Sequence, residues 1–523
     1  MSPAGRNGPA RRDPASRGIP LPAPRVVEPG QLVEAARELL GSGARLALVA
    51  GHHDDDIVRV VHTYLAPRRP PLELEVSVAD GVDGIPSLAT VSYPAGRFER
   101  EVRDLFGVTP LGHPLPRRLV RHGHWPAGYY PMRHDAPTAP AFGADEGSFP
   151  FLEVSGDEVY EIPVGPVHAG LIEPGHFRFS VVGETILRMK ARLWFVHRGV
   201  EKLFEGRPPE TGIELAERIS GDTAVGHSLA YTLAVEQAMG IQVDLADLAL
   251  RCMLLELERL HNHVADLGAI INDVGYGIVH AQAQVQRERL LRHNEHVTGH
   301  RLLRGAIGIG ATDVLAMPDL ALVADVAGNV AEIVDIALGN HVVLDRLTGT
   351  AVLGPADAHR IGTLGYVAKA SGLALDARHD HPLHPDLPDI DPVVHSTGDV
   401  LARFLVRAAE VQQSAALVGE LAAIAGPHQT TGRTARTTPD PHPPSARAAQ
   451  GGPVNRGLGV VEAWRGTLIH RVEIRAGTVS RCKIIDPSFF NWPALPLALK
   501  DTIVPDFPLA NKSFNQSYAG NDL

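Results

Sequence analysis

Cysteine is nearly absent from this sequence. Cys252 and Cys482 are the only two thiols among 523 residues. Two thiols this far apart in the chain cannot supply a four-cysteine zinc site or hold an iron–sulfur cluster. They also leave no basis for the disulfide framework typical of small secreted domains. The sequence therefore predicts a cytosolic protein that holds no thiolate-bound metal cluster of its own.

Long apolar runs are missing as well. No uninterrupted apolar stretch approaches the roughly 18 residues that a bilayer-spanning helix needs. Residues 1–30 are rich in Pro, Arg, Ala and Gly and lack the apolar centre of a secretory signal. We expect them to form a disordered tail, and we expect any membrane role to be peripheral or to depend on partners.

Charge and motif content exclude two more classes. The formal net charge of -11 argues against a nucleic-acid-binding protein. No GxGxxG motif follows an expected strand, so the sequence predicts no dinucleotide site, and NADH would be used only by other subunits. The 44% hydrophobic content over this length is enough for a large core.

Residues 31–135 predict a small α+β domain. An amphipathic helix is expected over 31–43, and LELEVSV (72–78) alternates apolar and polar residues as a strand with one buried and one wet face does. FEREVRDLFGV (98–108) predicts a helix with a mixed-charge side. That side is either a solvated face or a surface that docks against partner subunits, and its charges are Glu99, Arg100, Glu101, Arg103 and Asp104.

A linker rich in Pro, Ala and Gly is expected over 136–160, and residues 161–523 predict a second, mainly helical domain. Leu250, Met253, Leu257, Leu260, Val264 and Leu267 are spaced as the buried seam of one helix, beside a histidine pair that we interpret as structural. Residues 426–457 predict a long loop, and two strands are expected on either side of Ala476-Gly477. Helices are expected over 181–205, 211–239, 244–267, 279–303, 317–347, 356–371 and 396–425.

Histidines and charged residues of both signs gather among apolar residues between 160 and 223. Such a pattern indicates either a structural ion-pair network or a functional cavity. The residues concerned are His168, His176, Arg178, His197, Arg198, Glu201, Arg207, Glu217, Arg218 and Asp222.

Several motifs resemble known families. FEREVRDLFGV, GHPLPRRL (112–119) and YPMR (130–133) resemble the C subunit of bacterial respiratory complex I. Four further motifs resemble the D subunit of the same complex and the large subunit of group 4 [NiFe] hydrogenases of the formate hydrogenlyase type. They are IPVGPVHAGLIEPGHFRFSVVGE (162–184), HRGVEKLFEG (197–206), ERISGD (217–222) and LELERLHNHVADLG (255–268). The resemblance implies an α+β fold class: a small N-terminal α+β domain over 31–135, then a domain like the hydrogenase large subunit and the complex I D subunit over 161–523.

The chain departs from the hydrogenase pattern at the metal. That family holds nickel and iron with four cysteines, in RxCGxC and DPCxxC motifs. Here the corresponding positions hold hydroxyls and an amide, which are poor ligands for nickel. The degenerate positions are Ser220, Thr223, Ser488 and Asn491. We therefore expect no nickel–iron centre and no metal in this chain.

The resemblance also implies roles for other residues. The D subunit of complex I accepts a quinone headgroup in the corresponding space, and His168 and His176 are the candidates for headgroup contact, although the family tyrosine position holds Gly221. Glu201 matches a proton-relaying glutamate, for which a raised pKa is expected; the alternative is a salt bridge with Lys202, Arg198 or Arg207. Arg218 and Asp222 are expected to line the former metal cavity as a pair. Asp486 is expected to line it as well, where it forms a turn or cap.

The sequence thus predicts a peripheral subunit on the cytoplasmic side of the cell membrane. It would pass electrons from the iron–sulfur cluster of a partner small subunit to a quinone-type acceptor, with proton movement through antiporter-like and quinone-site membrane subunits. The alternative is a non-catalytic scaffold that keeps the hydrogenase fold for assembly and coupling.

Overall fold

The computed structural model describes residues 21–79, 84–144, 149–168, 172–427 and 453–523. The N-terminal part of the chain is a four-stranded sheet in the order β1-β4-β3-β2. Its helices are α1 (Leu32–Gly41) and α2 (Tyr93–Phe106), both expected from the sequence. Its strands are β1 (Arg25–Val26), β2 (Arg45–Asp54), β3 (Ile57–Leu65), β4 (Leu72–Ala79) and the short pair β5 (Ile85–Pro86) and β6 (Pro110–Leu111).

Two sequence expectations for this part need correction. Regular structure begins before residue 31, because β1 pairs with β4. The wet face of β4 is interrupted at Glu73, which is only 6% exposed. Its carboxylate lies 2.7 Å from Nε of Arg471, which is on β13 (Gly466–Arg475) near the end of the chain. Alternation alone could not predict this burial, because the partner lies almost 400 residues further along the chain.

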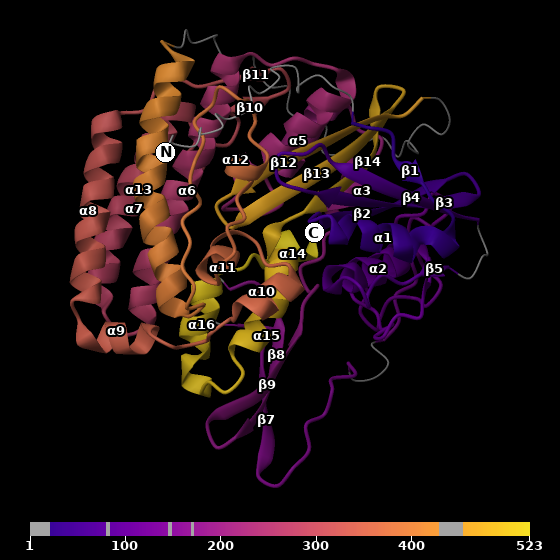
Figure 1. The fold of residues 1–523 in the computed structure, drawn as a ribbon, viewed down its shortest axis with the longest axis horizontal. Coiled ribbons are helices and arrows are strands. Elements are labelled where there is room, and N and C mark those ends of the chain that lie inside the picture. The colour runs from indigo at the N-terminus through magenta and orange to yellow at the C-terminus, as the bar shows by residue number, and fades with distance from the viewer. Residues whose placement is uncertain (1–20, 80–83, 145–148, 169–171, 428–452) are drawn as a thin grey trace, which may run out of the picture.

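A three-stranded antiparallel sheet follows residues 136–158, in whose described part no helix or strand occurs. It consists of β7 (Val159–Val164), β8 (His176–Val182) and β9 (Thr185–Arg192), and it extends away from the body of the molecule (Figure 1). The helix expected over 181–205 is therefore wrong for most of its length, and only α3 (Val200–Phe204) is helical there.

The larger part is built on long helices packed side by side (Figure 1). The predicted seam lies on α6 (Leu245–Asp273) and is confirmed, since all six of its residues are at most 1% exposed. Three expected helices are each broken in two, at 217–223, 339–340 and 362–364. The helices are α4 (Pro209–Ala216), α5 (Ala224–Met239), α6 (Leu245–Asp273), α7 (Gly277–Thr298), α8 (Leu320–Leu338), α9 (His341–Leu347), α10 (Pro355–Ile361), α11 (Gly365–Ala370), α12 (Ala377–Asp380) and α13 (Val400–Ala425), with the short strands β10 (Ile307–Gly308) and β11 (Ala311–Thr312) between α7 and α8.

A last sheet joins the two parts. The expected hairpin is confirmed, with β13 (Gly466–Arg475) paired to β14 (Thr478–Ile485), and β12 (Asn455–Ala463) adds a strand at the end of the expected loop, of which 428–452 lie outside the described residues. Helix α5 lies directly on β12: a Cβ on Gly459 would come within 1.9 Å of Ala230 O. The chain ends in α14 (Pro487–Asn491), α15 (Leu495–Ala498), α16 (Phe507–Phe514) and α17 (Tyr518–Asp522).

Candidate functional site

The loop that enters α5 and the segment that enters α14 bring the four degenerate positions into the interior. Ser220, Thr223, Ser488 and Asn491 are all at most 2% exposed. Ser517 joins two of them: its Oγ lies 2.8 Å from Ser220 Oγ, and its backbone N–H donates to Ser488 Oγ at 3.0 Å. The segment leading into α17 thus bonds to two of the positions where the hydrogenase pattern has thiolates.

The other two positions are also fully engaged. Thr223 Oγ1 donates to Asp222 at 3.0 Å and accepts from Trp464 Nε1 at 3.1 Å. Asn491 forms two hydrogen bonds with the backbone of Leu364, at 2.9 and 3.2 Å. Across the described residues, no group of three or more His, Cys, Asp or Glu side chains is placed to hold a metal ion. Burial raises the pKa of the Cys482 thiol, which packs in the core beside β13.

The expected Arg218–Asp222 pair is wrong. Asp222 pairs with Arg465, through two N–O distances of 2.7 Å, and Arg218 forms a surface pair with Glu214. Burial opposes ionisation of Asp222, but the Arg465 charge outweighs it and holds the pKa of Asp222 at about 2. The chain between Ser220 and Thr223 is therefore anchored to the turn after β12.

Asp486 caps α14, as expected for an Asp-Pro sequence, by accepting from Ser488 N at 2.8 Å. Its other carboxylate oxygen lies 3.2 Å from His227 Nε2, and His227 Nδ1 lies 3.1 Å from His470 Nε2. Although burial opposes ionisation, the His227 contact keeps the pKa of Asp486 below its usual value. A row of three buried polar side chains thus extends from α14 to the middle of β13.

Glu201 lies on α3 with partners that the sequence did not indicate. Its carboxylate accepts from Arg481 at 2.7 Å, from Lys483 at 3.0 Å and from the N–H of Ile484 at 3.0 Å. Burial alone would raise the pKa of Glu201, but the two cations on β14 outweigh it and hold this pKa at about 2. The raised pKa expected for a relay is therefore wrong, and so are the expected local partners.

A cavity of about 760 Å³ opens on the other side of Glu201. Its lining includes Trp125, Tyr129 and Met132 from the N-terminal part, together with Glu201, Lys483 and Asp486 from the rest of the chain. The lining also includes the α17 residues Gly520, Asn521 and Asp522 but none of the four degenerate positions. The space available for a ligand is therefore beside the former metal positions and separated from them by the C-terminal segment.

The two candidate histidines lie elsewhere. His168 Nε2 donates to Gly175 O at 2.8 Å, and His176 Nδ1 donates to Gly165 O at 3.0 Å, so they bond to the loop that joins β7 to β8. Neither lines the cavity, whereas Glu201 does. The loop contacts α17, since Ala519 N donates to Glu173 at 3.0 Å. The structure thus separates the two histidines from Glu201 by the C-terminal helix.

The charged side of α2 faces inward, which contradicts both interpretations made from the sequence. Glu99 accepts from Ser87 Oγ at 2.5 Å, and Asp104 accepts from Leu119 N at 2.8 Å and Val120 N at 2.9 Å. Glu101 contacts Lys483 at 2.6 Å. These charged side chains bind the chain's own loops and, through Lys483, strand β14.

Comparisons with known proteins agree with this architecture. A family model described as respiratory-chain NADH dehydrogenase, 30 Kd subunit, matches residues 25–141, and one described as the 49 Kd subunit matches residues 273–522. A model for nickel-dependent hydrogenase matches residues 198–267, which include Ser220 and Thr223. Formate hydrogenlyase subunit 5 of Escherichia coli is 35% identical over 443 residues, covering 81% of this chain and 74% of that protein. The chain belongs to the family of fused complex I C/D-like and hydrogenase large-subunit-like proteins.

Two further proteins are also similar to this chain. The C/D subunit of NADH-quinone oxidoreductase from Bacteroides thetaiotaomicron is 30% identical over 362 residues, covering 64% of this chain and 68% of that protein. The fold also superposes on one chain of the solved structure of the membrane-bound sulfane sulfur reductase, an archaeal respiratory membrane complex. The TM-score is 0.61 at 25% identity, and the match covers 70% of this chain and 99% of that chain. The relatives are subunits of membrane-bound oxidoreductase complexes. Within the described residues, this member contains no helix long and apolar enough to cross a bilayer.

Sequence reasoning missed Arg465, Arg481, Lys483 and Ser517 in this family member. A signal existed for two of them: Arg481 and Lys483 are two residues apart on a strand and therefore share one face. A paired cationic face in an otherwise apolar strand indicates a buried carboxylate partner. No comparable signal existed for Ser517, whose role depends on where the C-terminal segment folds.

Proposed function

We propose that this chain is the peripheral redox subunit of a membrane-bound complex, and that it places a quinone-type acceptor near an iron–sulfur cluster of a partner small subunit. The observation that carries the proposal is the 760 Å³ cavity beside the former metal positions, whose lining combines aromatic and apolar side chains with a few ionisable groups. Small-molecule sites are commonly apolar cavities with a few polar groups on one side. Attachment to the cytoplasmic face of the membrane would come through antiporter-like and quinone-site partner subunits.

Quinone reduction takes up two electrons and two protons, and the cavity offers candidate proton donors. Glu201 is unsuited, because Arg481 and Lys483 keep it ionised. Asp522 is better suited: burial raises its pKa to about 6, even though Asn521 Nδ2 and Val196 N donate to it. Burial also lowers the pKa of His197, so a neutral imidazole faces the cavity at neutral pH. In this arrangement Glu201 positions Lys483, and Asp522 exchanges protons.

The test is a quinone-analogue titration of the assembled complex. Leu203 lines the cavity and is 42% exposed, so Leu203→Trp adds bulk there without opening the core. We expect at least about a tenfold loss of affinity, equivalent to about 1.4 kcal/mol. Leu344→Trp is the matched control, because Leu344 is 36% exposed and lies outside the cavity lining. His176→Ala tests whether the β7–β8 loop contributes to headgroup contact. Unchanged affinity in Leu203→Trp would contradict the proposal whatever the result for His176→Ala, because His176 does not line the cavity.

A non-catalytic scaffold is the second candidate, and one observation favours it. Ser517 bonds to both Ser220 and Ser488, so the chain itself occupies space near the former metal positions. If the chain is a scaffold, the complex should bind no quinone analogue at the cavity, and it should fail to assemble when this chain is missing. Both functions predict that elemental analysis of the purified protein finds no stoichiometric nickel, and about one nickel per chain would contradict both.

A further inference from the structure

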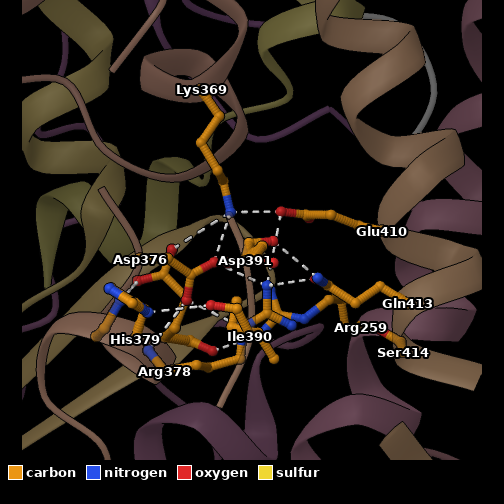
Figure 2. A network of polar contacts seen from close by, with 12 residues as sticks. Arg259, Lys369, Asp376, Arg378, His379, Ile390, Asp391, Glu410, Gln413 and Ser414 are labelled. Atoms are coloured by element: carbon orange, nitrogen blue, oxygen red, sulfur yellow. Dashed lines mark hydrogen bonds and ion pairs between the residues drawn. The ribbon is translucent and has the colours of Figure 1, made fainter. Parts of the chain in front are cut away.

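A buried network of charged side chains lies where α6, α11, α12, α13 and β12 meet, and Figure 2 shows part of it around Lys369, Asp376, Arg378 and Glu410. Its carboxylates outnumber its permanent cations. The carboxylates are Glu256, Asp376, Glu410 and Glu462, and the cations are Arg259, Lys369 and Arg378. All but Arg378 have side chains at most 2% exposed, and Arg378 is 11% exposed.

Three of the four carboxylates are paired at close range. Asp376 contacts Lys369 at 3.0 Å and Arg378 at 2.7 Å. Glu256 contacts Arg259 and Arg378, both at 3.1 Å, and accepts from Ser414 Oγ at 2.6 Å. Glu410 contacts Lys369 through one oxygen, and its other oxygen lies 2.6 Å from His263 Nε2. These three have the pairing that a buried ionised carboxylate requires.

Glu462 is the exception. Its Oε2 accepts from Ala377 N at 3.0 Å and from Thr467 Oγ1 at 2.9 Å. Its Oε1 is buried without a hydrogen-bond partner among the described residues and lies 3.9 Å from Lys369 Nζ. An unpaired oxygen on a buried carboxylate is costly, and a proton removes the charge.

Glu462 is one of the residues that line a small cavity. Its volume is about 50 Å³, and it is lined by Glu462, Glu256, Arg378 and His381 together with apolar side chains. A buried water needs on the order of 10–15 Å³ and two or more polar partners. The cavity therefore has room for about three waters, and polar groups to hold them.

The other end of the network lies against the former metal positions. The ring of His263 lies 6.0 Å from that of Trp464, centroid to centroid. Trp464 Nε1 donates to the backbone O of Asp222 at 3.1 Å. Contacts thus connect the water cavity, Glu462, Lys369, Glu410 and His263 in that order.

We propose that Glu462 carries a proton in the folded protein and exchanges it with water in the small cavity. The network is then a proton-holding site next to the loop of the former metal positions. Glu462 releases its proton to water in the cavity and regains a proton from the same water, so no other reactant is consumed. This protonation is independent of whether the complex reduces a quinone.

The groups around Glu462 act in both directions on its pKa, and burial prevails. Burial is the main cause that raises its pKa to about 7, and Asp376 adds to it, while Lys369, the Ala377 N–H and Arg259 oppose it. Arg45 from β2 also interacts with Glu462, and Glu256, Arg378 and His381 line the same cavity.

Infrared spectroscopy of the full-length protein tests the proposal, because a protonated carboxylic acid has a carbonyl band that a carboxylate lacks. We expect Glu462→Gln to remove one such band, and we expect that band in the native protein to disappear as pH rises through about 7. A group whose pKa is raised on folding stabilises below its unfolded pKa, here about 4.5, and loses this stabilisation as pH rises to the folded value. Relative to Glu462→Gln, the unfolding equilibrium constant of the native protein should therefore rise by up to about tenfold per pH unit in that window.

Two further variants keep the test decisive. Thr467→Val removes the hydroxyl that donates to Oε2, so the midpoint of the band should move to higher pH. Glu256→Gln is the matched control in the same network: Glu256 is paired and ionised, so this change should leave the band in place. A band that persists in Glu462→Gln, or a midpoint that Thr467→Val does not move, would overturn the proposal.

Discussion

Arg465 and Asp222 form a two-point ion pair, with both N–O distances 2.7 Å, that ties the turn after β12 to the loop of the former metal positions. Arg465 Nε also donates to Asn515 O at 2.7 Å. One guanidinium therefore holds two segments that meet at Ser220 and Ser517.

Replacing this arginine should loosen both segments. We expect Arg465→Met to lower the free energy of unfolding by about 2 kcal/mol, since hydrogen bonds between charged groups each contribute about 1.5–3 kcal/mol and Asp222 is partly exposed. Urea unfolding measures the change. Arg218→Ala is the control: its pair with Glu214 is on the surface, and its loss should cost less than about 0.5 kcal/mol. Equal effects would mean that the Asp222 pair has no special role.

The Glu201 contacts predict a specific acid sensitivity. A carboxylate whose pKa is depressed on folding stabilises above its unfolded pKa, about 4.5, and loses this stabilisation as pH falls toward the folded value, about 2. Glu201→Gln should therefore be less stable at neutral pH, by about 3–5 kcal/mol for a broken buried pair, and should lose less stability on acidification. Unfolding midpoints measured at pH 7 and pH 3 compare the two proteins. A steeper acid loss in the variant would contradict the assignment.

The close contact of α5 with β12 predicts that Gly459 cannot be replaced. A Cβ there would lie 1.9 Å from Ala230 O, so Gly459→Ala must move backbone and should cost about 3 kcal/mol or more. Gly419, in the middle of α13, is the matched control because nothing lies within 4 Å of the position that a Cβ would take there. Gly419→Ala should stabilise by about 0.5–1 kcal/mol. Thermal unfolding of the two variants should give shifts of opposite sign.

Glu73 and Arg471 predict how the N-terminal part is held. The Glu73 carboxylate accepts from Arg471 Nε at 2.7 Å and Nη2 at 3.2 Å, with both side chains at most 1% exposed. Glu73→Gln leaves a buried guanidinium partly unpaired and should cost about 3–5 kcal/mol. Limited proteolysis should then cut within residues 136–158 more rapidly. Glu34→Gln, in an exposed pair with Arg37, should leave the cleavage rate unchanged.

The sequence predicted the features that depend on local pattern. The α6 seam, the β13–β14 hairpin and the α2 helix all follow from periodicity or turn residues. The β8–β9 hairpin was missed although Gly183, with φ of 56°, stands in a two-residue turn typical of hairpins. Its apolar residues fit a helical spacing as well as an alternating one, so the periodicity did not decide between them.

The site was less predictable because its contacts join distant segments. The loss of the four thiolates is visible in two short motifs. The partners of Glu201 are about 280 residues away, and those of Ser220 about 300, so spacing contains no information about them. The charged side of α2 was assigned to solvent or to partners because the groups that donate to its carboxylates lie outside the helix: Ser87 Oγ, Lys483 Nζ and the backbone N–H groups of Leu119 and Val120.

The ion pairs between the N-terminal sheet and the last sheet have a practical consequence for how the two halves remain together. Glu73 with Arg471 and Glu101 with Lys483 are buried contacts, and separating the two parts would leave each of these carboxylates without the cation that it contacts. Two polypeptides made by dividing the coding sequence within 136–158 should therefore associate and co-purify. The covalent linkage between the two parts keeps them close, whereas the buried ion pairs bind them to each other.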